Sequence, residues 1–118
     1  MTSVLVVEDN ADLRDMYQEI LSALGDCSVR VAETALEALD ALAVERPAVV
    51  LLDLGIPGDF PALLAALHRG NGTRVILASG ARDLPERATA LGAAAYLLKP
   101  FTPEALLATV ERVVGAAG

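Results

Sequence analysis

The chain alternates short apolar runs with longer stretches of helical periodicity, and this alternation repeats five times. The runs that predict strands are residues 4–7, 29–32, 48–54, 75–79 and 95–98. Parallel strands need a crossover connection, which is usually a helix, so the alternation predicts a parallel sheet with helices on both faces. The expected fold class is α/β, with one doubly wound sheet of five strands and five helices.

The composition of the runs predicts the order of the strands. Residues 4–7, 48–54 and 75–79 are almost continuously apolar, as is typical of central strands covered on both faces. The second run alternates apolar and polar residues, which suits an edge. Placing it there gives the order 2-1-3-4-5, the flavodoxin-like arrangement, in which ligands bind beyond the carboxyl ends of strands one and three.

Several helix boundaries carry local signals. An apolar stripe at helical spacing, which should end at Gly25, predicts that one face of the first helix is buried. The stripe consists of Leu13, Met16, Tyr17, Ile20, Leu21 and Leu24. The starts of the other helices are expected at the Thr34–Glu37 capping box, after Pro61, after Asp83 and at Thr102–Pro103.

Length and charge exclude several classes of protein. With 118 residues and 54% hydrophobic residues, residues 1–118 are expected to form a single domain. No apolar run approaches the roughly 20 residues of a membrane span, and the start of the chain does not resemble a signal peptide. The net charge of −7 disfavours direct binding to nucleic acid or to an anionic membrane. The lone Cys27, expected to be a small buried hydrophobe, fits a reducing compartment, and we expect a cytoplasmic protein.

Polar residues follow four of the predicted strands. Glu8 and Asp9 follow the first, Asp53 ends the third, Ser79 the fourth, and Lys99, the only lysine in the chain, follows the fifth. Because the carboxyl ends of parallel strands share one edge of the sheet, three carboxylates, a hydroxyl and an ammonium group should converge there.

Such a cluster needs a cation to offset the repulsion between its carboxylates. Two unit charges about 4 Å apart repel by several kcal/mol at the effective dielectric of a protein surface. Mg²⁺ typically takes one or two carboxylates and completes its shell with water and phosphate oxygens. Lys99 and Ser79 would face an anion from the other side, so the cluster predicts a magnesium site that receives a phosphoryl group.

Four stretches carry a resemblance to a known family: "VLVVEDN", "VVLLDLGIPG", "ILASG" and "GAAAYLLKPF". With them the chain resembles, over essentially its whole length, the receiver domain of two-component response regulators. The resemblance implies these roles: Asp53 as phosphoacceptor, Glu8, Asp9, Asp53 and Gly55 as the Mg²⁺ site, Ser79 and Lys99 as phosphoryl ligands, and Ser79 and Tyr96 as switch residues.

The resemblance also implies a function. The domain would accept a phosphoryl group from a histidine kinase or histidine phosphotransfer protein. It would then switch the face made by its fourth helix, fifth strand and fifth helix for an unknown downstream partner. We expect a signalling switch and not an enzyme, with no output domain in this chain.

Three departures from the family pattern accompany the resemblance. The loop after Pro57 is one residue shorter than usual, Gly55 and Ala81 lack side chains that could orient an attacking water, and "GAAAYLL" is apolar where dimerising members carry charges.

The Lys99–Pro100 bond is expected to be cis, because only an X-Pro bond makes that isomer cheap.

Two other functions remain open at this point. The chain could be a receiver-like interaction module that works without phosphorylation, although the complete set of site residues argues against this. It could also be a phosphatase that forms an aspartyl phosphate. Phosphatases of the haloacid-dehalogenase type carry a second aspartate two residues after the nucleophile, where this chain has Gly55.

Overall fold

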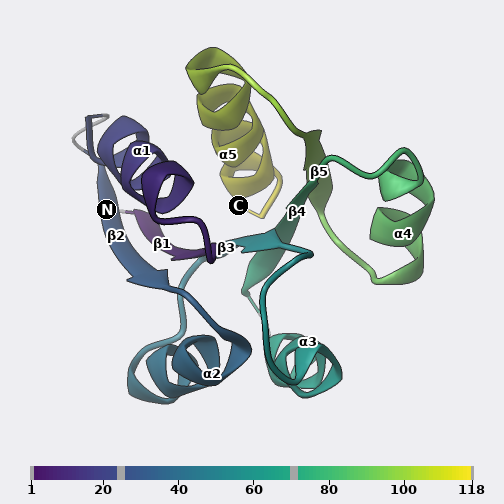
Figure 1. Cartoon of the computed structure of the whole chain (residues 1–118). Coiled ribbons are helices and arrows are strands. Elements are labelled where there is room, and N and C mark those ends of the chain that lie inside the picture. The colour runs from purple at the N-terminus through teal and green to yellow at the C-terminus, as the bar shows by residue number, and fades with distance from the viewer. Residues whose placement is uncertain (1, 24–25, 70–71, 118) are drawn as a thin grey trace.

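The predicted sheet forms, with its five strands parallel and in the predicted order β2-β1-β3-β4-β5 (Figure 1). The computed structural model describes residues 2–23, 26–69 and 72–117. The strands are β1 (Thr2–Val7), β2 (Cys27–Ala32), β3 (Val49–Asp53), β4 (Arg74–Ser79) and β5 (Ala95–Leu98). The fold class inferred from the alternation is confirmed.

Strand bounds differ from the predicted ones by one or two residues, except at β5. β1 and β2 begin two residues early because Thr2 pairs with Cys27 and extends the ladder beyond the apolar runs. Cys27 is only partly buried, because it lies on this edge strand. β3 is one residue shorter at each end than the apolar run, since hydrophobicity marks burial and not the limits of pairing.

Five helices connect or follow the strands in the described parts of the chain: α1 (Ala11–Ala23), α2 (Ala35–Val44), α3 (Phe60–His68), α4 (Leu84–Ala90) and α5 (Pro103–Ala117). The predicted caps of α2 and α5 are present, since the hydroxyls of Thr34 and Thr102 accept backbone N–H bonds. The expected end of α1 at Gly25 lies outside the described residues. None of these helices is long and apolar enough to cross a membrane.

The third helix begins at Phe60, one residue before Pro61, and not after it as predicted. The Asp59 carboxylate caps this helix by accepting the N–H of Ala62 at 3.0 Å. This N-cap places Phe60 and Pro61 in the first turn, where a missing proline N–H costs nothing.

Two hydrophobic cores lie between the sheet and the helices, one on each face of the sheet. α1 and α5 cover one face of the sheet, and α2, α3 and α4 cover the other (Figure 1). Within α1, Tyr17 and Leu21 are buried against the sheet, but Met16 is 41% exposed. The expected burial of Met16 is wrong because the arc of α1 that faces the sheet and α5 is narrower than the apolar stripe.

Two arginines each bind two carbonyl oxygens at the end of a helix. Arg30 donates to the carbonyl oxygens of Ala41 and Glu45 at the end of α2. Arg46 uses two nitrogens in the same manner at the end of α3. A planar guanidinium presents its N–H donors in a fixed fork, which suits two neighbouring carbonyl oxygens.

Candidate functional site

The pleat of the sheet decides which side chains at the strand ends share a face. Successive side chains along a strand point to opposite sides. The residues two positions before Glu8, Asp53 and Lys99 all belong to the core under α1 and α5: Val6, Leu51 and Leu97. Glu8, Asp53 and Lys99 therefore emerge on this same side, although they come from three different strand ends.

The ammonium of Lys99 bridges two of the predicted carboxylates. Its Nζ donates to Glu8 Oε1 at 2.6 Å and to Asp53 Oδ1 at 2.8 Å. Glu8 is 2% exposed and Asp53 is 8% exposed, while the Lys99 side chain is 21% exposed. The structure thus joins residues that are 91 and 46 positions apart, as the convergence of strand ends predicts.

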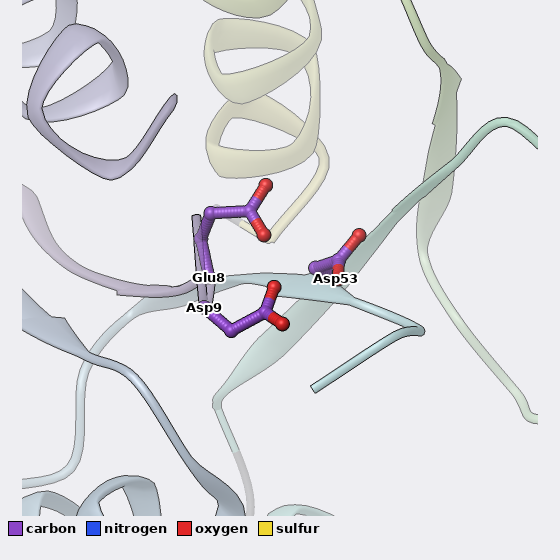
Figure 2. Close-up of side chains that lie close together, drawn as sticks. All are labelled: Glu8, Asp9 and Asp53. Atoms are coloured by element: carbon purple, nitrogen blue, oxygen red, sulfur yellow. The ribbon is translucent and has the colours of Figure 1, made fainter. Parts of the chain in front are cut away.

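Asp9 completes the acidic group from the more exposed side. Figure 2 shows the side chains of Glu8 and Asp9 extending to the side on which Asp53 lies. One carboxylate oxygen from each of the three residues lies within 4.8 Å of the others. Asp9 is exposed, so the group is open to solvent on that side.

Burial and charge shift two of the pKa values in this site. Burial raises the pKa of Glu8, and the nearby charge of Asp53 adds to this, although Lys99 opposes it. Burial alone would lower the pKa of Lys99, but its hydrogen bonds to Asp53 and Glu8 outweigh this effect and raise it. Lys99 is therefore a permanent cation at neutral pH.

The arrangement fits a divalent cation in charge and in chemistry. Three ionised carboxylates and one ammonium leave a formal charge of −2, which Mg²⁺ would neutralise. All three carboxylates supply the hard oxygen ligands that Mg²⁺ prefers. Gly55 has no side chain and could contribute only its backbone carbonyl, while its N–H donates to Asp53 Oδ2 at 3.0 Å.

Ser79 hydrogen bonds to the site residue Lys99 through its backbone, while its hydroxyl binds within its own loop. Ser79 is the last residue of β4, and Leu77, two residues earlier, packs in the core under α2, α3 and α4. Its Oγ accepts the N–H of Ala81 at 3.1 Å, and its carbonyl oxygen accepts the N–H of Lys99 at 2.9 Å. No described hydrogen bond joins this hydroxyl to the carboxylates, and its role as a phosphoryl ligand stays a prediction.

Tyr96 lies on β5 and points away from the site. It is 42% exposed and lines a hollow of about 500 Å³ between α4, β5 and α5, together with Pro85, Thr89 and Arg112.

The predicted cis bond between Lys99 and Pro100 is confirmed.

The shortened loop after Pro57 packs against the start of α2. The carbonyl oxygen of Pro57 accepts the N–H of Ala35 at 3.0 Å. Gly58 has a φ of +110°, and a Cβ at this position would lie 3.0 Å from the Cβ of Ala35. Glycine is needed here both for the left-handed backbone and for the close approach.

Two contacts were not predicted, and only the first of them lies beside the site. Tyr17, assigned only to the buried stripe, stacks on Phe101, and no periodicity signal marks such a contact between elements. His68, at the end of α3, is exposed, and its Nε2 lies 3.0 Å from the carbonyl oxygen of Leu91 at the end of α4. The one signal in the sequence that could have indicated Tyr17 is its aromatic ring, which stands in a mostly aliphatic stripe of a chain with 3% aromatics.

Comparison with known proteins places these features in one family. A family model described as the response regulator receiver domain matches residues 4–111. The response regulator MprA of Mycobacterium tuberculosis is 37% identical over 115 residues, which is 94% of this chain and 50% of MprA. The transcriptional regulatory protein PdtaR of the same organism is 35% identical over 94% of this chain and 56% of PdtaR. The chain spans about half the length of these curated relatives.

Solved structures of similar proteins have the same fold over almost the full length of both compared chains. The chemotaxis response regulator CheY4 of Vibrio cholerae superposes with a TM-score of 0.85 at 28% identity, covering 96% of this chain and 98% of that one. A response regulator receiver protein from Burkholderia phymatum gives a TM-score of 0.87 at 30% identity, with 98% and 96% covered.

Proposed function

The chain belongs to the family of response regulator receiver domains, and from this membership we propose that it accepts a phosphoryl group on Asp53 in a two-component phosphorelay. One observation carries the proposal. A buried carboxylate at the end of β3 is held by a single ammonium beside two further carboxylates, at the edge where ligands bind in this fold.

The two oxygens of Asp53 have different surroundings, which suggests a division of roles. Oδ1 is bound by Lys99, whereas Oδ2 accepts only the N–H of Gly55 among the described hydrogen bonds. We assign the in-line attack on the donor phosphorus to Oδ2, which forms the new P–O bond as the bond to the donor nitrogen breaks. Bound Mg²⁺, held by Glu8, Asp9 and Asp53, would neutralise charge on the transferring group.

Lys99 has a different task in each state. Before transfer it compensates Glu8 and Asp53, and after transfer its ammonium would bind a phosphoryl oxygen. This exchange of partners requires a charge that can move on a flexible stem, which lysine provides. Stabilisation of this kind is electrostatic and positional, and the protein's groups need not form covalent bonds other than at Asp53.

The signal would then pass to the face made by α4, β5 and α5. The hydroxyl of Ser79 would leave the N–H of Ala81 for a phosphoryl oxygen, and the exposed ring of Tyr96 would turn inward. The hollow beside Tyr96, in which Arg112 is the one charged lining residue, supports this proposal, because an unidentified downstream partner could dock on it. A local packing change of this kind can bias a two-state element.

The proposed partners and compartment follow from the same chemistry. The phosphoryl donor would be a histidine kinase or a histidine phosphotransfer protein, and we place the domain in the cytoplasm. Since the phosphoryl group stays on the chain's own Asp53, the domain acts as a switch and not as an enzyme.

Incubation with Mg²⁺ and acetyl phosphate, followed by intact mass measurement, tests the proposal. One acid-labile phosphoryl group per chain, lost when Asp53 is changed to Asn, is the expected result. No labelling would favour an interaction module that works without phosphorylation. Continuous hydrolysis of acetyl phosphate, with no labelled chain, would favour a phosphatase.

Hydrogen exchange with and without beryllofluoride, a phosphoryl mimic, tests the switch. Protection should change across residues 79–99 as well as near Asp53. If only the loops that hold Glu8, Asp9 and Asp53 respond, the domain binds the anion without switching its α4–β5–α5 face.

A further inference from the structure

The bridge from Lys99 to Glu8 joins two strands that are not neighbours. β3 and β4 lie between β1 and β5, and three steps between adjacent strands amount to about 14 Å. The direction in which the turn after β5 leaves the sheet therefore decides whether the ammonium of Lys99 reaches Glu8. Something on the β1 side of the molecule has to hold that turn.

A pair of stacked aromatic rings makes this connection. Tyr17 on α1 and Phe101 in the turn between β5 and α5 have ring centroids 5.2 Å apart and ring planes inclined by 18°. Tyr17 is 3% exposed, so its ring is fixed within the molecule. It lies on the helix that follows Glu8 and Asp9, while Phe101 follows Lys99 by two residues.

The lysine stem shares a wall with these rings. Lys99, Tyr17 and Phe101 line one hollow of about 310 Å³, along with Leu13, Met16 and Pro100. Burial raises the pKa of the Tyr17 hydroxyl, and the charges of Lys99, Glu8 and Asp53 also act on it. The ring of Tyr17 therefore packs against the turn that carries the ammonium and borders the same hollow as the lysine stem.

We propose that Tyr17 is a positioning residue for Lys99: by stacking on Phe101 it fixes the turn after β5, so that the ammonium spans Glu8 and Asp53. The ring is the required part, because the contact is made by the two aromatic faces. Phenylalanine at position 17 should therefore preserve the arrangement, and leucine should not. The effect on phosphorylation rests on the proposed function, but the effect on Lys99 does not.

Lys99 itself provides a direct readout, because labelling with ¹³C-lysine gives signals from one side chain only. The two Hε protons of a held lysine have separate chemical shifts, whereas free rotation averages them. We expect separate shifts in the wild type and in Tyr17→Phe, and averaged shifts in Tyr17→Leu. Met16→Ala is the matched control, since it removes a neighbouring side chain from the same hollow without touching the stack.

Phosphorylation by acetyl phosphate at saturating Mg²⁺ gives the second readout. Tyr17→Leu should slow labelling by about tenfold to a hundredfold, because misplacing a charged group by about 1 Å has effects of this size. Tyr17→Phe and Met16→Ala should stay within about twofold of the wild type, which corresponds to about 0.4 kcal/mol in barrier height.

The outcomes separate the two proposals. If Tyr17→Leu leaves the Lys99 shifts separate and the labelling rate unchanged, the positioning role is refuted. If the Lys99 shifts average but the wild type is never labelled, the positioning role stands and the proposed phosphorylation fails. Should Tyr17→Leu not fold, Phe101→Leu removes the partner ring from the less buried side and must give the same averaging.

Discussion

Changing Lys99 to Met should destabilise the domain in the absence of metal while strengthening its affinity for Mg²⁺. The substitution keeps the length of the apolar stem and removes the charge. Glu8 and Asp53, which are 2% and 8% exposed, then lose the ammonium at 2.6 and 2.8 Å. Two carboxylates remain with oxygens less than 5 Å apart, where they repel by about 3 to 4 kcal/mol at an effective dielectric of 20.

The size of the effect follows from the burial of the pair. Removing one partner of a buried ion pair costs about 3 to 5 kcal/mol, and because the Lys99 side chain is 21% exposed, solvent reduces this to about 2 to 4 kcal/mol. In the proposed site, Mg²⁺ would bind the folded chain and compete with the ammonium for the same oxygens. Saturating Mg²⁺ should therefore recover most of the lost stability.

Urea unfolding in EDTA and in excess Mg²⁺ measures both effects. Arg82→Met is the control, because it removes the same unit of charge from an exposed position and should change the free energy of unfolding by less than about 0.5 kcal/mol. If Lys99→Met in EDTA were no less stable than this control, Lys99 could not be compensating the buried carboxylates.

Three further predictions concern the same site and the lone cysteine. Asp53→Asn should abolish acid-labile phosphorylation in the intact mass assay, and its stability should stay within about 1 kcal/mol of the wild type, because relief of repulsion offsets a lost hydrogen bond; labelling of the variant at another residue would contradict the assignment. Glu8→Gln combined with Asp9→Asn should weaken Mg²⁺ binding strongly in calorimetric titration, and an unchanged titration would place the metal elsewhere. Burial raises the pKa of Cys27 above its ordinary value, and the charge of Asp26 adds to this; since only the thiolate reacts, iodoacetamide should alkylate Cys27 more slowly at pH 8 in the folded chain than in urea, and equal rates would show that the thiol is not shielded.

The sequence was sufficient to predict the fold and the group of charges at its edge. Alternation of strands and helices determines the crossovers, and the composition of residues 4–7, 48–54 and 75–79 identifies the central strands. Once that order is known, the meeting of Glu8, Asp53 and Lys99 follows from topology. Distance along the chain has no influence on it.

Contacts that depend on the direction of a single side chain could not be predicted in the same way. The hydroxyl of Ser79 accepts a bond two residues away because the local turn offers the N–H of Ala81. Tyr17 and Phe101 meet because α1 and the turn after β5 converge in three dimensions. Helical periodicity predicts on which face of its helix a residue lies. It gives no information about the residue that it contacts on another element.

The side on which Asp53 emerges is set by the number of residues that precede it in β3. An insertion of one residue between Val49 and Asp53 would turn the carboxylate to the face of the sheet that carries α2 and α3, away from the ammonium, without altering any residue of the site. An insertion of two would restore its side but shift its height. Any change of spacing within β1, β3 or β5 should therefore disperse the site, whereas insertions in the turns at the opposite end of the sheet should leave it intact.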